Sequence, residues 1–139
     1  MRVIAGSARG HKLTAVPGSD TRPTTDRVKE AIFSMIGPYF NGGLGLDLFA
    51  GTGGLGIEAL SRGLDRVIFV DQRHQAVRVI KHNLSATRLI EQAEVYRHDA
   101  AKLIASLQQR ELRFRVIFLD PPYGQKQLIR YLERIGENG

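Results

Sequence analysis

The sequence has no cysteine and no long hydrophobic run. The missing cysteine excludes disulfide bonds and thiolate zinc sites, and it agrees with a reducing cytoplasm. No apolar run approaches the roughly 18 residues that a membrane-spanning helix needs. The N-terminus also lacks the apolar core of a signal peptide. We therefore expect a cytoplasmic protein without a membrane segment.

What is present is an ordinary globular composition with an excess of positive charge. The 139 residues are 42% hydrophobic and 24% charged, and the formal net charge is +6. This length fits one domain with a core of its own. The basic balance favours an acidic partner, with nucleic acid first. We expect a single domain over 1–139, made of a basic N-terminal hairpin or arm (1–20) and a core (21–139).

The beginning of the chain is its most one-sidedly basic part. Patterns typical of short strands at 2–5 and 12–16 flank a turn, which predicts a hairpin. The segment carries Arg2, Arg9 and Lys12 but no acidic residue. We predict that these three side chains contact RNA. The alternative is a solvated hairpin whose charge has no partner.

A helix is predicted next. Apolar residues recur at helical spacing: Val28, Ile32, Met35 and Ile36. Thr24 or Thr25 can cap this helix, Asp26 suits its positive end, and the Gly-Pro pair at 37–38 ends it.

From residue 45 onward, strand and helix patterns alternate. The expected strands are 46–49, 66–70, 94–97 and 116–119. One expected helix ends near Gly63, and the others span 72–84, 100–109 and 127–135. Strands that are apolar on both faces and alternate with helices indicate a mostly parallel sheet covered by helices on both faces. The predicted fold class is α/β.

Carboxylates stand at the ends of these strands. Ligands of such sheets bind beyond the carboxyl ends of the strands, where the chain order reverses. Asp71, Asp99 and Asp120 follow three of the strands at or near their ends, and Asp47 lies in the first, just before a glycine loop. The sequence therefore predicts one ligand site at this edge of the sheet.

The glycine loop matches the pattern G-x-G-x-x-G at Gly51, Gly53 and Gly56. Glycines let a ligand approach the backbone amides, and the following helix points its positive end at an anionic group. Asp71, 20 residues after Gly51, is suited to the hydroxyls of a ribose. The motif indicates an adenosine-containing cofactor, although a dinucleotide enzyme or a purely structural turn would look similar. Asp47 disfavours a dinucleotide, since it could instead accept a hydrogen bond from the ammonium group of an amino-acid-bearing cofactor.

The most specific motif is Asp120-Pro121-Pro122-Tyr123. Two prolines make the turn stiff and leave carbonyl oxygens exposed. If the Asp120 carboxylate and the Pro121 carbonyl accept both hydrogens of an exocyclic base amine, its lone pair leaves conjugation and becomes nucleophilic. Tyr123 offers a flat face for a base taken out of its stack. The catalytic prediction is therefore these four residues, against the alternative of a rigid turn with an ordinary tyrosine.

These motifs resemble a known family. The motifs of class I S-adenosylmethionine-dependent amino-methyltransferases resemble four parts of this sequence: 46–60, Asp71, Asp99 and 120–123. More specifically, the segments 2–6, 9–10 and 22–33 resemble the RsmD-type bacterial enzymes, which methylate the N2 amine of a guanine in 16S ribosomal RNA. The resemblance covers essentially the whole chain and implies a Rossmann-like fold.

The resemblance also implies roles for individual residues. Asp47 and the loop 51–56 would hold the methionine part of the cofactor, Asp71 the ribose and Asp99 the adenine amine. The full set of expected cofactor contacts is Asp47, Phe49, Ala50, Gly51, Thr52, Gly53, Gly56, Asp71, Gln72, Asp99, Ala100, Arg22, Thr24 and Thr25. The expected RNA contacts are Arg2, Arg9, Lys12, Arg22 and Arg27.

Several of these residues have a second interpretation. Asp99 could simply cap the helix that follows it, Asp26 and Arg27 could be first-turn helix charges, and Arg22 could pair with Asp20. The four histidines, His11, His74, His82 and His98, have no metal-ligand spacing, and we expect no metal site.

We predict an S-adenosylmethionine-dependent methyltransferase acting on guanine N2 in small-subunit ribosomal RNA. The RNA could be free or within an assembly particle, and we expect a monomer. The alternatives are an adenine-N6 methyltransferase on RNA or DNA, a binding module without turnover, and an NAD(P)-linked oxidoreductase, which the 120–123 motif disfavours. The chain ends 16 residues after Tyr123, whereas the resemblance implies further strands. We therefore expect that the C-terminal strands are missing from it.

Overall fold

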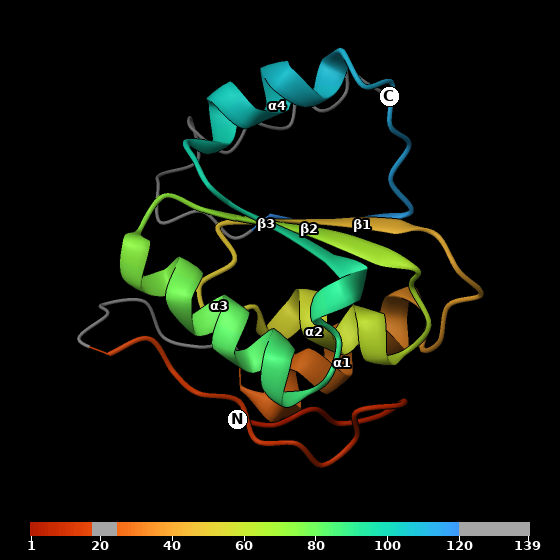
Figure 1. Cartoon of the computed structure of the whole chain (residues 1–139). Helices are drawn as coiled ribbons and strands as arrows, with labels where there is room; N and C mark the ends of the chain where they lie inside the picture. The colour runs from red at the N-terminus through yellow and green to blue at the C-terminus, as the bar shows by residue number, and fades with distance from the viewer. Residues whose placement is uncertain (18–24, 120–139) are drawn as a thin grey trace.

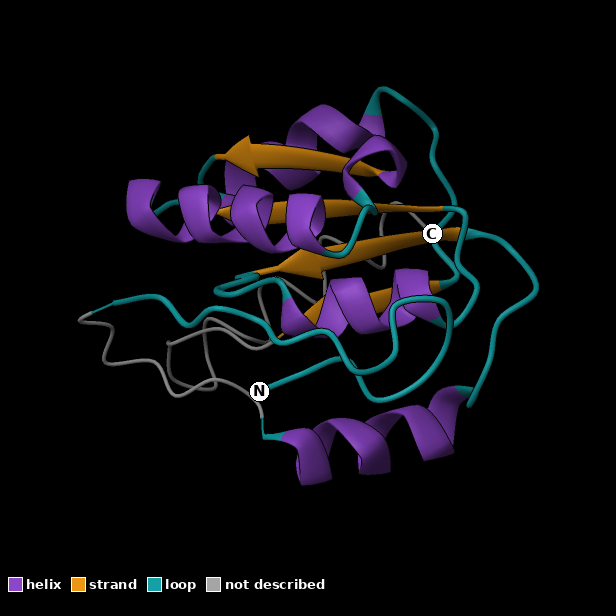
Figure 2. Ribbon diagram, turned by 60° about the horizontal axis from the view of Figure 1, so that its bottom comes forward, coloured by secondary structure: helices purple, strands orange, loops and turns teal. Residues whose placement is uncertain are grey.

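The computed structural model describes residues 1–17 and 25–119 (Figure 1). Its centre is a sheet of four strands: β1 (Leu44–Leu48), β2 (Arg66–Asp71), β3 (Ala93–Arg97) and β4 (Val116–Leu119). The strand order is β3-β2-β1-β4, and every neighbouring pair is parallel (Figure 2). The predicted α/β class with a parallel sheet is confirmed.

Helices cover both faces of this sheet, as predicted. They are α1 (Asp26–Ile36), α2 (Gly54–Ser61), α3 (His74–Ala86), the short 3-10 helix η1 (Ile90–Gln92) and α4 (Ala100–Gln108). In Figure 1 the sheet is seen edge-on, with α1, α2 and α3 on one side and α4 on the other. The helix expected at 127–135 lies outside the described residues.

Side chains alternate between the two faces of β2, so the strand contributes to two cores. Val67 and Phe69 pack in a cluster with residues of α2 and α3, whereas Ile68 and Val70 pack with residues of α4. All four side chains are buried. A strand that is buried on both faces must be apolar throughout, which is why the run was visible in the sequence.

The strand order reverses between β1 and β4. From β1 the chain moves outward through β2 to β3, then returns to the other side of β1 to form β4. Leu48 at the end of β1 is in register with Val70 of β2 and with Leu119 of β4. This topological switch point is where doubly wound sheets bind their ligands.

Helix α1 forms at its predicted place, but the buried face differs from the apolar stripe in the sequence. The Thr25 hydroxyl caps the helix by accepting a hydrogen bond from the Val28 amide, and Gly37 follows its last residue. The side chains buried are Lys29 and Phe33, whereas Met35 is 86% exposed. Lys29 can be buried because a carboxylate of α2 lies opposite, as described below.

The predicted hairpin is only partly correct. Its two strands reduce to one antiparallel bridge between Arg2 and Lys12. Backbone pairing reaches the Gly10 amide, which donates to the Val3 carbonyl, and the amides of Ile4 and Ala5 then donate to the Glu58 carboxylate instead of to a partner strand. Three side chains of the segment are buried in the core beside α2: Val3, Ala8 and Leu13. Figure 2 shows this segment running between α1 and α2. We call residues 1–17 the N-terminal arm; its backbone is fixed on the helices, while basic side chains remain outside.

Within the described ranges, no helix is long and apolar enough to cross a membrane. The same residues contain no group of three or more His, Asp or Glu side chains that could hold a metal ion.

Candidate functional site

The glycine loop leaves the end of β1 in an unusual backbone conformation. Phe49, directly after the strand, has a φ of 58°, and Gly51 and Gly53 follow with φ values of 60° and 81°. Positive φ is readily adopted by glycine and is strained for phenylalanine. Strain of this kind collects at ligand sites, where the surrounding structure enforces it. The loop is fixed at its start by the Ala50 amide, which donates to the Val70 carbonyl over 2.9 Å.

Asp47 of β1 fixes the other end of the loop. Its buried carboxylate accepts a hydrogen bond from the Gly56 amide, with Oδ2 at 3.0 Å from the nitrogen. A Cβ atom on Gly56 would lie 2.3 Å from the ring of Phe69, so only glycine fits there. The negative charge also lies at the positive end of α2, where it is favoured. The predicted contact between Asp47 and an ammonium group stays a prediction.

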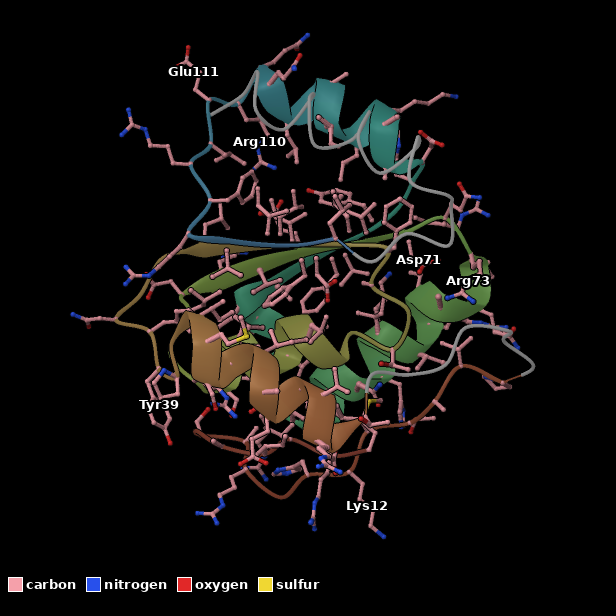
Figure 3. All side chains as sticks on the ribbon, turned by 180° about the vertical axis from the view of Figure 1, so that it is seen from behind. Lys12, Tyr39, Asp71, Arg73, Arg110 and Glu111 are labelled. Atoms are coloured by element: carbon pink, nitrogen blue, oxygen red, sulfur yellow. The ribbon has the colours of Figure 1, made fainter. Side chains whose placement is uncertain are left out.

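Asp71 ends the neighbouring strand β2 and binds the start of the same loop. Its Oδ2 accepts the Gly51 amide over 2.9 Å, and its Oδ1 accepts the Arg73 amide over 2.9 Å. The Arg73 side chain folds back on the carboxylate, with Nε 3.2 Å from Oδ1 (Figure 3). Two carboxylates from adjacent strands therefore hold one glycine loop between them.

The third carboxylate, Asp99, lies just beyond β3. It is half-buried and caps α4, because its Oδ1 accepts the Lys102 amide over 3.1 Å. The helix cap that the sequence left open as an alternative is thus present, and a contact with adenine stays a prediction. The ends of β2 and β3 meet here, since the His98 amide donates to the Asp71 carbonyl over 3.2 Å. Ala100 is buried against the sheet, whereas Gln72 is exposed.

Thr52, inside the loop, is buried and hydrogen-bonded on both sides. Its hydroxyl accepts the Gly54 amide over 3.2 Å and lies 3.9 Å from the Met1 sulfur. Its carbonyl accepts the side-chain amide of Asn83 over 2.9 Å. The loop is consequently in contact with the N-terminal arm.

Four of the five predicted RNA contacts are described, and all four are exposed: Arg2, Arg9, Lys12 and Arg27. Arg2 and Lys12 are neighbours across the bridge of the arm. Arg2 also pairs with Asp26, with Nε 3.7 Å from Oδ2, and Lys12 extends away from the protein body (Figure 3). The structure therefore leaves these cations accessible.

Six predicted site residues lie outside the described part of the chain: Arg22, Thr24, Asp120, Pro121, Pro122 and Tyr123. Their assignments remain predictions. The described chain reaches Leu119, which is paired with Leu48 at the end of β1.

A buried ionic cluster behind the site was not predicted from the sequence. Glu58 of α2 lies between two cations, with Lys29 Nζ 3.4 Å from Oε1 and Arg62 Nε 2.7 Å from Oε2. The Arg62 guanidinium also stacks on the Phe33 ring at 4.8 Å. Burial lowers the pKa of Lys29 below its ordinary value, and the neighbouring Glu58 offsets part of this shift. The signal available was one carboxylate in the middle of an otherwise apolar helix.

Asn83 of α3 was missed as well. It is 1% exposed and lies on the helix face that also carries Ile80 and Leu84. Its side chain bonds to the arm at Thr14 and to the glycine loop at Thr52. A polar residue at a position where the helical spacing calls for an apolar one was the available signal.

Comparisons with known proteins agree with this geometry. The chain is 57% identical over 137 residues to "Putative rRNA methyltransferase YlbH" of Bacillus subtilis, covering 99% of this chain and 74% of that protein. It is 40% identical over 124 residues to "Ribosomal RNA small subunit methyltransferase D" of Haemophilus influenzae, covering 88% of this chain and 64% of that protein. A solved structure described as "Putative methyltransferase yhhF from Escherichia coli" is 34% identical, with a TM-score of 0.85 over 100% of this chain and 75% of that one.

A parallel sheet in this order, with a glycine loop held between the first two strands, defines a Rossmann-like domain of the methyltransferase type. The model of one family, described as Conserved hypothetical protein 95, matches residues 1–139. The chain belongs to this family.

Proposed function

We propose that this protein is an S-adenosylmethionine-dependent methyltransferase that modifies the exocyclic N2 amine of a guanine in small-subunit ribosomal RNA. The proposal agrees with the names of the relatives, which describe ribosomal RNA methyltransferases. It also agrees with the RsmD-type resemblance of the sequence motifs.

The observation that carries the proposal is the pair of carboxylates on the glycine loop. Asp47 and Asp71 come from adjacent parallel strands and bind the amides of Gly56 and Gly51. A cofactor with a ribose needs an acceptor for its hydroxyls at the end of the second strand, and Asp71 supplies one. A Cβ atom built on Gly51 would meet nothing closer than an Arg73 nitrogen at 3.9 Å, so the loop is open on this side.

The charges of these residues suit S-adenosylmethionine. When bound, this cofactor supplies a methyl group attached to a positively charged sulfur. An amine nitrogen can attack this methyl group and displace the sulfur from it. Asp47 and Asp71 contribute negative charge at the loop, while the N-terminus of α2 is suited to a carboxylate group. The residues of the chain would bind and orient both reactants, which lowers the barrier without a covalent intermediate on the protein.

The base-handling residues follow directly on β4 in the sequence. The Asp120 carboxylate would accept a hydrogen bond from one N–H of the guanine amine, and the Pro121 carbonyl would accept one from the other N–H. The nitrogen lone pair would then be free to attack. Tyr123 would stack on the base. The strand that precedes them is paired with β1, whose end carries the glycine loop.

The basic residues of the arm complete the proposal. We assign Arg2, Arg9 and Lys12 to the phosphates of the RNA, together with Arg27 at the start of α1. We also propose a monomer that works in the cytoplasm, where bacterial ribosomal RNA is found.

The test is nucleoside analysis after methyl transfer. The protein is incubated with S-adenosylmethionine and unmethylated small-subunit RNA, first free and then within subunits, and the digested RNA is analysed by mass spectrometry. N2-methylguanosine is the expected product. N6-methyladenosine alone would favour the adenine enzyme. Binding of cofactor or RNA without any methylated product would favour a binding module, and calorimetric heat with NAD but none with S-adenosylmethionine would contradict the proposal.

A further inference from the structure

The buried side chain of Asn83 joins two segments that are far apart in the sequence. Its Oδ1 accepts the Thr14 amide over 2.8 Å, and its Nδ2 donates to the Thr14 carbonyl over 3.0 Å. The same Nδ2 donates its other hydrogen to the Thr52 carbonyl over 2.9 Å. Both donors of the amide are therefore used, one on the arm and one on the glycine loop.

The contact with Thr14 fixes the arm in one register. An asparagine side chain that accepts a backbone N–H and donates to the carbonyl of the same residue imitates a neighbouring strand. This pairing lies close in sequence to Lys12, whose side chain is exposed. The amides of Ile4 and Ala5 bind Glu58 on the other limb of the arm, so both limbs are fixed to helices.

The contact with Thr52 fixes the centre of the glycine loop. Thr52 lies between Gly51 and Gly53, both at positive φ, where the backbone has little conformational preference of its own. Within the loop, the Gly53 amide donates to the Ala50 carbonyl and the Gly54 amide to the Thr52 hydroxyl. From outside the loop, Asn83 adds a hydrogen bond to the Thr52 carbonyl.

Packing alone does not account for an asparagine at this position. A buried amide gives little net stability even when it is fully hydrogen-bonded, whereas an apolar side chain of similar volume would add to the core. What an apolar residue could not do is bond to the arm and the loop at once. We propose that Asn83 is a positioning residue that couples the two, so that RNA bound on the arm and cofactor bound in the loop strengthen each other. This inference rests on the proposed function, which assigns these two ligands.

The decisive variant is Asn83→Asp, which keeps the size of the side chain. It removes both N–H donors and sets a carboxylate against the carbonyls of Thr14 and Thr52. Asn41→Asp makes the same chemical change at an exposed position and serves as the matched control. Thr14→Pro is a second variant that removes the amide accepted by Oδ1, restricts the backbone of the arm at this point and leaves the sequence of α3 unchanged.

The measurement is the calorimetric Kd of S-adenosylhomocysteine, which cannot donate a methyl group, with and without saturating small-subunit RNA. Wild type and Asn41→Asp should bind it about tenfold more tightly when RNA is present, and the reciprocal effect on RNA affinity should be equal. In Asn83→Asp and Thr14→Pro the ratio of the two Kd values should fall to about one. If Asn83→Asp does not fold, Thr14→Pro decides the question.

A wild-type ratio of one, or the full wild-type ratio in the variants, would overturn the inference. If Asn83 were needed only for stability, its substitution would lower the melting temperature. At temperatures below melting, the ratio of the two Kd values would then be unchanged. Failure of the proposed function looks different, because the wild-type protein would then form no N2-methylguanosine in the RNA.

Discussion

The guanidinium of Arg73 lies against the carboxylate of Asp71, with Nε 3.2 Å from Oδ1 and Nη2 3.4 Å from Oδ2. This carboxylate is the group to which we assign the ribose hydroxyls. Arg73 is more than one-third exposed, so its guanidinium can move into solvent while the buried Asp71 carboxylate keeps the hydrogen bonds from the Gly51 and Arg73 amides. Cofactor and arginine therefore compete for the same oxygens.

Arg73→Ala should consequently strengthen cofactor binding. An ion pair of this exposure is worth at most about 1 kcal/mol, so the Kd of S-adenosylmethionine should fall by about fivefold or less. Isothermal titration calorimetry on both proteins measures the change. Arg78→Ala on the exposed side of α3, the helix that begins after Arg73, is the control and should leave the Kd unchanged. Weaker binding by Arg73→Ala would mean that the arginine orients Asp71 for the cofactor instead of competing with it.

Asp71→Ala should act mainly on the cofactor. It removes the proposed acceptor of the ribose hydroxyls and also releases the Gly51 amide. Hydrogen bonds to charged groups contribute about 1.5–3 kcal/mol, which corresponds to a Kd raised by about ten- to a hundredfold. Turnover at saturating cofactor should be affected much less. An unchanged Kd would remove Asp71 from the cofactor site.

Asp120→Ala should show the opposite pattern. Because we assign Asp120 to the guanine amine, its removal should abolish methyl transfer while the calorimetric Kd of S-adenosylmethionine stays near the wild-type value. Single-turnover methylation with radiolabelled cofactor measures the loss. Wild-type turnover in this variant would show that the Asp-Pro-Pro-Tyr motif does not activate the base.

The frame of the site could be predicted from the sequence because it depends on local patterns. β2 is a run of apolar residues bounded by Arg66 and Asp71, and it appears within one residue of its predicted limits. The loop between β1 and α2 was found because its glycines have few substitutes. At Gly56, for example, the Phe69 ring leaves no space for a side chain.

The contacts that could not be predicted are those between polar residues distant in the sequence. Glu58 binds the backbone of the arm across more than fifty residues, and Asn83 binds Thr14 across 69. Lys29 gave an actively misleading signal, because a lysine beside an apolar stripe normally faces solvent. Two partners that are distant in the sequence make its burial possible: the Glu58 carboxylate, 3.4 Å from Nζ, and the Arg2 carbonyl, which accepts from Nζ over 2.7 Å.

Glu58→Gln should destabilise the protein strongly. One carboxylate lies between two buried cations, Lys29 and Arg62, so its loss leaves both of them without this anionic partner. Breaking a buried ion pair in this way costs about 3–5 kcal/mol of unfolding free energy, which urea denaturation measures. Glu94→Gln makes the same change in the partly exposed pair with Arg110 and should cost about 1 kcal/mol or less. Equal effects of the two substitutions would mean that the buried cluster contributes no more to stability than the partly exposed pair.

Lys29 should also make stability depend on pH in the alkaline range. Burial lowers its pKa in the folded protein, whereas the unfolded chain keeps the ordinary value of 10.5. Between the two pKa values the unfolded state binds more protons, so the free energy of unfolding should rise as the pH increases toward 10.5. Lys29→Met removes this titration and leaves Glu58 paired with Arg62, so its free energy of unfolding should rise less over the same range. Urea denaturation of both proteins at several pH values just below 10.5 gives the two slopes. The difference between the two slopes of unfolding free energy against pH reports the proton of Lys29 alone. A wild-type slope equal to or smaller than that of Lys29→Met would therefore contradict a lowered pKa of Lys29.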